Sequence, residues 1–141
     1  MTTITSSTVH TSTNNRSIWK LAAVAGVVAA AAASAVAGIA HSAGVSLDVN
    51  GEPIPVAGFA TLTLLFTAIG FVLALGIRRW AGNPRRTFIR TTVVLTALSF
   101  LPDLFVSGAA AETRVTLMVT HLVAAAIFIP VVAGRLPEGR S

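Results

Sequence analysis

The chain of 141 residues has no cysteine and few charged side chains. Without cysteine it forms no disulfide, no thiolate metal site and no cysteine nucleophile. Only 11% of its residues are charged and 54% are hydrophobic, whereas an average soluble domain has roughly 25% charged residues. A soluble domain of this size needs more polar side chains than this to cover its surface. The composition therefore excludes most soluble folds and favours a surface that faces lipid.

Motifs of catalysis and metal binding are also absent from the sequence. The three histidines, His10, His41 and His121, are widely separated, and no HExxH, glycine-rich phosphate loop, GxSxG or EF-hand pattern occurs. We therefore expect no metal and no cofactor. The net charge of +5 is compatible with nucleic acid, but basic residues that flank apolar runs are typical of membrane orientation, so we expect no nucleic-acid partner.

Four apolar runs each approach the ~20 residues that a helix needs to span a bilayer. We predict an all-α integral membrane bundle of four transmembrane helices that forms one domain over residues 18–136. The predicted spans are at about 18–40, 55–80, 84–106 and 113–133. Residues 1–17 are rich in threonine and serine and predict a disordered tail, and residues 137–141 predict a second short tail.

The first run has two interpretations. Arg16 and Lys20, the apolar stretch after them and the small residues 35–37 match a cleavable signal peptide. We favour a retained span because small residues recur with a period of four, a spacing that lets membrane helices approach closely. These residues are Ala22, Gly26, Ala30, Ser34 and Gly38. We expect them to pack helices together, within the chain or against a second copy.

The loops carry strong turn signals. Asn50 and Gly51 favour a small hairpin, but Pro53 and Pro55 lack the amide donors of regular strand pairing. We therefore favour the interpretation that these prolines begin the second helix, where a missing donor has no cost. Asn83 and Pro84 supply a cap and a first-turn proline, which predicts that the third helix begins at Pro84.

The basic residues predict the orientation. Of the ten lysines and arginines, all but Arg114 fall on the side of the two predicted tails. The positive-inside rule then predicts that both termini are cytoplasmic, in a multi-pass protein of the plasma membrane. The arginines around the loop between the second and third spans are expected to contact anionic lipid headgroups. They are Arg78, Arg79, Arg85, Arg86 and Arg90.

Polar side chains share one face on several predicted helices, and such faces point into a membrane bundle. On the third helix the stripe consists of Thr92, Thr96 and Ser99 and ends at Asp103, and the second helix has Thr63, Thr67 and Gly70 in a similar spacing. The hydroxyls of such stripes commonly bond to carbonyls of their own helix.

The candidate functional residues are Asp103, His121 and Arg114. An ionisable residue inside a membrane span is by default a candidate site. Asp103 lies about one turn below the outer end of the third helix, and His121 about two turns below the outer end of the fourth. We expect Asp103 to pair with Arg114 or His121 in a pocket beneath the 41–55 loop. The alternative is structural, because Pro102 removes a helix hydrogen bond that such a polar cluster would replace.

Three stretches carry a family resemblance: GNPRRTF at the start of the third helix, LTALSFLPDL around Asp103 and THLVAAAIFIP around His121. With the acidic, proline-containing outer loop, they resemble a group of small actinobacterial four-helix integral membrane proteins catalogued as a domain of unknown function. The resemblance covers about residues 18–136. It implies four spans and a plasma-membrane location, and it implies no activity, substrate or catalytic residue.

Three functions are compatible with these features. The first, which we favour, is a non-enzymatic membrane protein that packs with itself or with a larger membrane partner. The second is a membrane enzyme or lipid-binding protein with an outer-leaflet pocket for an isoprenoid or another apolar molecule, in which Asp103 and His121 act as acid and base. The third is a dimeric proton-coupled transporter, which is disfavoured because Asp103 lies far from the membrane midplane.

Overall fold

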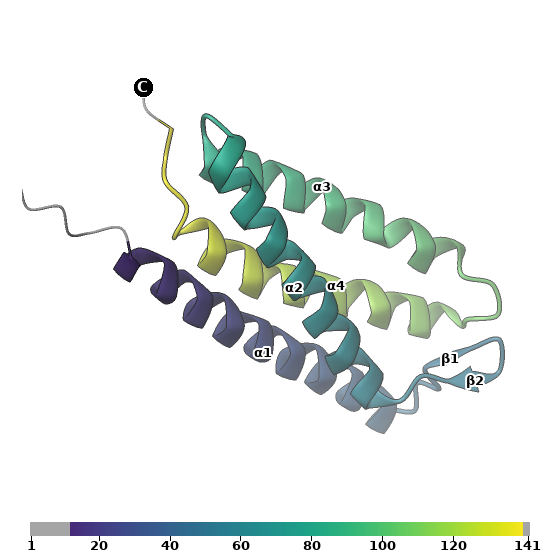
Figure 1. The fold of residues 1–141 in the computed structure, drawn as a ribbon. Helices are drawn as coiled ribbons and strands as arrows, with labels where there is room; N and C mark the ends of the chain where they lie inside the picture. Colours follow the sequence, from purple (N-terminus) through teal and green to yellow (C-terminus); the bar gives the residue numbers. More distant parts are fainter. Residues whose placement is uncertain (1–11, 140–141) are drawn as a thin grey trace, which may run out of the picture.

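The computed structural model describes the backbone of residues 12–139 and the side chains of residues 18–139. This part of the chain contains four helices and one small hairpin (Figure 1). The elements are α1 (Ser12–Ser42), β1 (Asp48–Val49), β2 (Glu52–Pro53), α2 (Val56–Trp80), α3 (Pro84–Phe105) and α4 (Ala111–Ala133). Each helix is long and apolar enough to cross a membrane. The predicted all-helical architecture with four spans is confirmed.

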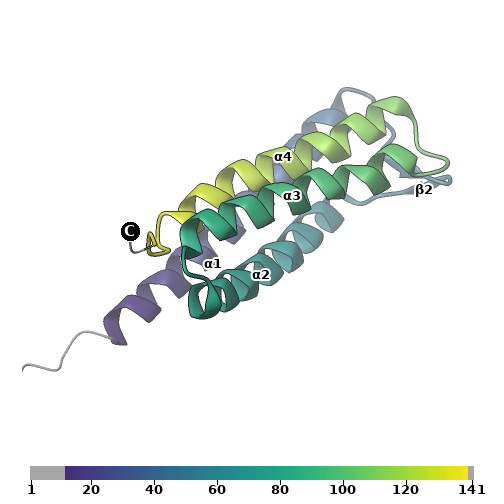
Figure 2. The same ribbon diagram turned by 90° about the horizontal axis from the view of Figure 1, so that it is seen from above.

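The helices form a closed four-membered bundle. α1 lies between α2 and α4, and α3 lies between the same two helices on the opposite side (Figures 1 and 2). The pairing of α1 with α4 is the most extensive in the bundle. α2 and α3 meet at the loop that joins them and diverge toward their other ends (Figure 1). The two helices are therefore close together at the arginine-rich end of the bundle, which includes this loop, and apart near the hairpin.

Helix α1 begins earlier than the sequence predicts. Its backbone is helical from Ser12, so residues 12–17, which we expected to be disordered, are part of the helix. Extending an existing helix adds one hydrogen bond for each residue fixed, whereas starting one is costly. The long apolar span supplies the start, and the polar residues before it continue the helix. The rest of the predicted tail, residues 1–11, lies outside the described residues.

The small residues of α1 pack within the bundle of this chain. Ala22, Gly26 and Ala30 are buried and Ser34 and Gly38 are half-buried. A second row of buried small residues runs beside them: Ala25, Ala29, Ala33 and Ala37. A Cβ atom added to Gly26 would lie 3.0 Å from the hydroxyl oxygen of Thr67 in α2. The small side chains therefore let α1 approach its neighbours within the same bundle.

A hairpin forms between α1 and α2. Val49 pairs with Glu52, which leaves Asn50 and Gly51 as a two-residue turn. Both turn residues have positive φ, at 54° and 80°, as in the type I′ turn that matches the twist of a hairpin. The turn chemistry of this dipeptide therefore decides the local fold.

The interpretation that Pro53 opposes strand pairing is wrong. Asp48 pairs with Pro53, and the amide of Ile54 donates to the Leu47 carbonyl at 2.9 Å. Because hydrogen-bonded and non-hydrogen-bonded pairs alternate along an antiparallel ladder, Pro53 occupies a position where no amide donor is needed. Pro55 is the N-cap of α2, which begins one residue later.

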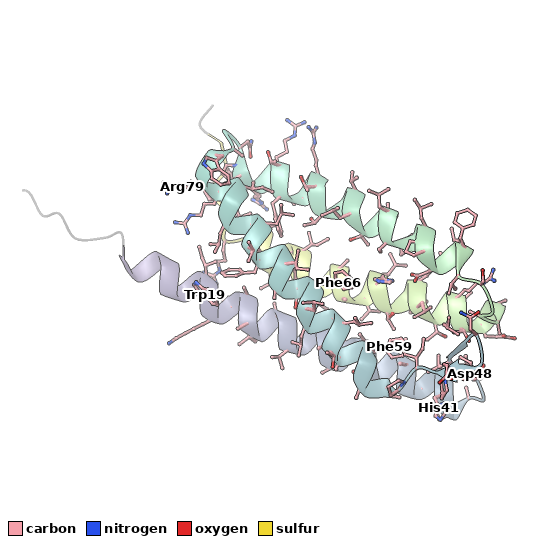
Figure 3. The ribbon with its side chains drawn as sticks, turned by 45° about the vertical axis from the view of Figure 1, so that its right-hand side comes forward. Trp19, His41, Asp48, Phe59, Phe66 and Arg79 are labelled. Atoms are coloured by element: carbon pink, nitrogen blue, oxygen red, sulfur yellow. The ribbon has the colours of Figure 1, made fainter. Side chains whose placement is uncertain are left out.

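The hairpin closes its end of the bundle. Leu47 is only 1% exposed and packs with Ala37 of α1 and Phe59 of α2. The amide of Asn50 donates to the carbonyl of Gly108 in the α3–α4 loop at 3.2 Å. The hairpin thus joins the first helix pair to the second, and Figure 3 shows Asp48 and Phe59 at this end.

The opposite end is ordered by the α2–α3 loop and the C-terminal segment. Pro84 is the first residue of α3, and the side chain of Asn83 accepts a hydrogen bond from the Arg86 amide at 3.2 Å. The predicted start of this helix is confirmed. Arg85 forms an ion pair with Glu138, and its amide donates to the Pro137 carbonyl at 3.3 Å. Part of the predicted second tail therefore packs on this loop.

Two apolar clusters stabilise the two ends. The larger one, at the arginine-rich end, surrounds the fully buried Phe88 and includes Phe71, Phe128, Val132 and Leu136. The smaller one contains Ala37, Leu47 and Phe59 beneath the hairpin. The middle of the bundle on the side of α2, α3 and α4 is less densely filled, and the candidate site lies there.

Candidate functional site

A cavity of about 390 Å³ lies among α2, α3 and α4. Its volume falls in the range of roughly 300–1,000 Å³ that is typical of small-molecule sites. Its lining is mainly apolar, and all three helices contribute. The apolar residues that line it include Leu62, Phe66, Ile69, Leu73, Leu95, Ala124, Ala125, Phe128 and Ile129. We call this cavity the α2–α3–α4 pocket.

The pocket is partly open where α2 and α3 diverge. Large apolar side chains from both helices stand at this opening and are exposed: Leu62, Phe66 and Ile69 from α2, and Leu95 from α3. Figure 3 shows Phe66 midway along α2. An exposed apolar patch of this kind marks an interaction surface or a ligand groove. In a bilayer, the opening would face lipid chains.

Hydroxyl groups form the polar part of the lining. Thr92 donates to the Phe88 carbonyl at 2.7 Å, and Thr96 donates to the Thr92 carbonyl at 2.8 Å. The hydroxyls of Thr67, Ser99 and Thr120 bond in the same way to carbonyls of their own helices. The hydrogens of these five hydroxyls are therefore used in bonds to their own helices, as the sequence predicted for such stripes. Their oxygens can still accept a hydrogen bond.

Asp103 and His121 lie in contact. The Nδ1 atom of His121 is 2.8 Å from the Oδ2 atom of Asp103, and their side chains are 32% and 10% exposed. Neither atom has a hydrogen-bond partner among the described residues. Helical side chains lean toward the N-terminus of their helix. Because α3 and α4 are antiparallel, these two side chains lean toward one another.

Arg114 does not complete a three-residue site. Its Nη1 atom donates to the Leu104 carbonyl at 3.2 Å, and its Nη2 atom donates to the Val106 carbonyl at 3.0 Å. These carbonyls lie at the C-terminal end of α3, where a helix leaves carbonyls without partners and favours a positive charge. Arg114 therefore caps α3, and of the two predicted partners of Asp103 only His121 contacts it.

The pocket lies deeper than the predicted one. His121 contributes to the lining, whereas Asp103 and Arg114 do not. α4 begins at Ala111, two residues before the predicted span, so His121 lies about 15 Å along a helix of roughly 34 Å. The hairpin contacts the α3–α4 loop at Gly108. The hairpin therefore packs on the loop that joins α3 and α4, and the roof over Asp103, Arg114 and His121 stays a prediction.

Several lining residues were not among the sequence candidates. Thr120 and Ala124 line the pocket beside His121 on α4. The stripe of Thr63, Thr67 and Gly70 on α2 lines it as well, and its spacing was the only signal for these positions. A Cβ atom on Gly70 would lie 3.0 Å from the ring of Phe128, so this glycine lets α4 approach α2 at the inner end of the pocket.

The arginines expected to contact headgroups gather around the loop between α2 and α3. Arg79, Arg85, Arg86 and Arg90 are exposed, and Arg78 is half-buried. Figure 3 shows Arg79 at this end of the bundle. Within residues 18–139, no group of three or more histidine, aspartate or glutamate side chains is placed to hold a metal ion.

A comparison with known families gives a match over residues 13–138, which covers nearly all of α1, the other three helices and the pocket. The chain belongs to DUF6069, a family of unknown function. The resemblance to a domain of unknown function is confirmed to this extent. No curated protein and no solved structure matches the chain. Membership of DUF6069 therefore assigns no activity, and the functional argument depends on the pocket.

Proposed function

We propose that the protein is a multi-pass membrane protein that binds an apolar, membrane-soluble molecule in the α2–α3–α4 pocket. The observation that carries this proposal is a partly open cavity of about 390 Å³, lined mainly by apolar side chains, with exposed apolar residues at its opening. A ligand dissolved in lipid would enter between α2 and α3 without crossing water. This corresponds to the lipid-binding alternative raised by the sequence, and it requires no catalysis.

In the proposed topology the protein lies in the plasma membrane, and both of its termini are cytoplasmic. The exposed arginines at one end support it through the positive-inside rule, and they would contact anionic headgroups there. The burial of small α1 residues within the bundle supports a retained first span over a cleaved signal peptide. An actinobacterial origin stays a prediction from the family resemblance.

The other functions that the sequence suggested have less support. Assembly with a second copy was favoured by the small-residue stripe of α1, but Ala22, Gly26 and Ala30 are buried within the chain. Proton transport needs a path of ionisable groups across the membrane. Within the described part of the chain, His121 is the one ionisable residue that lines the pocket, and its neighbour Asp103 lies two residues from the end of α3. A binding role makes use of the pocket that the fold contains.

Photolabelling tests the proposal. The protein, purified and placed in liposomes, would be labelled with a long-chain alkane that carries a diazirine, and the labelled peptides would be identified by mass spectrometry. The matched variants are Ala125→Phe, which fills the pocket, and Ala126→Phe, which adds the same ring at an exposed neighbouring position.

We expect labelling of pocket residues in the wild type and in Ala126→Phe, and a loss of at least about fivefold in Ala125→Phe, since ligand and ring compete for one space. Thermal unfolding in detergent would show whether both variants fold. Equal labelling of the two folded variants would refute the proposed function.

A further inference from the structure

The α2–α3–α4 pocket offers a ligand far more hydrogen-bond acceptors than donors. Five of its six hydroxyls, those of Thr67, Thr92, Thr96, Ser99 and Thr120, already donate to backbone carbonyls. Their oxygens can still accept a hydrogen bond from a ligand. Thr63 is the sixth hydroxyl. A ligand in this pocket therefore meets many acceptors and few donors.

His121 adds a stronger acceptor to this set. Its Nδ1 atom is buried against the carboxylate of Asp103. A carboxylate oxygen carries no hydrogen when ionised, and its negative charge 2.8 Å from Nδ1 favours a proton on Nδ1 over one on Nε2. In a neutral imidazole with that tautomer, Nε2 is an acceptor. The side chain of His121 is 32% exposed although its Nδ1 atom is buried, and the residue lines the pocket.

The charges around the pocket disfavour an ionised ligand. Among the described residues that line it there is no lysine or arginine, so an anionic headgroup would lack a cationic partner. The nearest carboxylate, Asp103, lies directly behind His121 and would repel an anion. The mainly apolar lining also penalises a cation, because a buried charge is costly unless it is paired.

We infer that the ligand of this pocket ends in a neutral hydrogen-bond donor, as a long-chain alcohol does, and that Nε2 of His121 accepts its hydrogen. This inference rests on the proposed function and names the class of molecule that the pocket selects. Asp103 acts as a positioning residue whose charge favours the His121 tautomer with the proton on Nδ1. An alkane chain occupies the apolar part of the pocket, and the hydroxyl group lies among the threonine oxygens and the histidine.

The test compares four diazirine probes of equal chain length in liposomes. They end in a hydroxyl, a methyl ether, a carboxylate or a plain methyl group. The methyl ether accepts but cannot donate a hydrogen bond, so it isolates the donor. One hydrogen bond gained without other change is worth roughly 1 kcal/mol, which corresponds to about a fivefold preference for the alcohol over the ether.

Two variants locate the acceptor. His121→Phe keeps an aromatic ring but removes Nε2, and we expect it to abolish the preference for the alcohol over the ether while alkane labelling persists. His41→Phe makes the same change at an exposed histidine that does not line the pocket, and we expect the preference to stay unchanged.

The outcomes separate the two proposals. If no probe labels pocket residues, the proposed function and this inference are both wrong. If the alkane labels them but the alcohol is no better than the ether, or the carboxylate is preferred, the pocket binds a ligand and the donor rule fails. If the preference is kept in His121→Phe, His121 is not the acceptor.

Discussion

The contact between the hairpin and the α3–α4 loop can be tested through one glycine. Gly108 has a φ of +73°, and a Cβ atom added there would lie 2.4 Å from Oδ1 and 2.9 Å from Cα of Asn50. The first of these atoms can rotate away, but the second belongs to the backbone. Gly108→Ala therefore forces the hairpin and the loop apart.

The cost of Gly108→Ala has two parts. A residue other than glycine loses roughly 1–2 kcal/mol in the left-handed region. Separation of the two loops also removes the hydrogen bond from the Asn50 amide, which is worth about 1 kcal/mol. We expect the free energy of unfolding to fall by about 2–3 kcal/mol in total.

Two other glycines separate these contributions. Gly44 has a φ of +94° but open space around its Cβ position, and Gly82 has open space and no positive φ. We expect Gly44→Ala to cost about 1–2 kcal/mol and Gly82→Ala to cost close to nothing. The assay is reversible unfolding by SDS titration in mixed micelles, followed by far-ultraviolet circular dichroism. If Gly108→Ala and Gly44→Ala cost the same, the hairpin does not pack on the loop.

Three further substitutions test the packing and the caps in the same assay. Phe88→Ala empties a fully buried site and should cost about 3–5 kcal/mol. Phe105→Ala removes a side chain from a residue that is 77% exposed and should cost little. Equal losses of stability would contradict the assigned core. Arg114→Gln removes two charged hydrogen bonds at the end of α3 and should cost at least about 1.5–3 kcal/mol, and an unchanged stability would show that the cap is dispensable. Asn83→Ala removes the N-cap of α3 and should cost about 1 kcal/mol, with Asn83→Ser as the variant that retains a capping oxygen and should recover most of the loss.

The sequence predicts the helices well because local signals define them. Apolar runs of spanning length give the four helices, and the Asn83–Pro84 pair locates the start of α3 within one residue. The contact between Asp103 and His121 was also predicted, since both lie on inward faces of antiparallel neighbours. These inferences need only helical periodicity and the order of the elements.

Other features depend on geometry that no single segment contains. Pro53 is tolerated in β2 because it falls at a pair that is not hydrogen-bonded. The turn at Asn50 sets which pairs of the ladder are hydrogen-bonded. The partners of Arg114 are backbone carbonyls, and these are accessible only because α3 ends where it does. The pocket depends on the angle between α2 and α3, and residues such as Phe66 are exposed or packed according to that angle.

The packing of α1 against α4 also has a consequence for biosynthesis. Helix α1 is made first and α4 last, yet these two form the most extensive pair in the bundle, and Ala29, Ala33 and Ala37 of α1 are fully buried. Until the ribosome has produced α4, one flank of α1 faces only lipid. Contacts between distant parts of a chain form late, because a long loop must close first. Of these four helices, the last to leave the ribosome therefore completes the packing of the first.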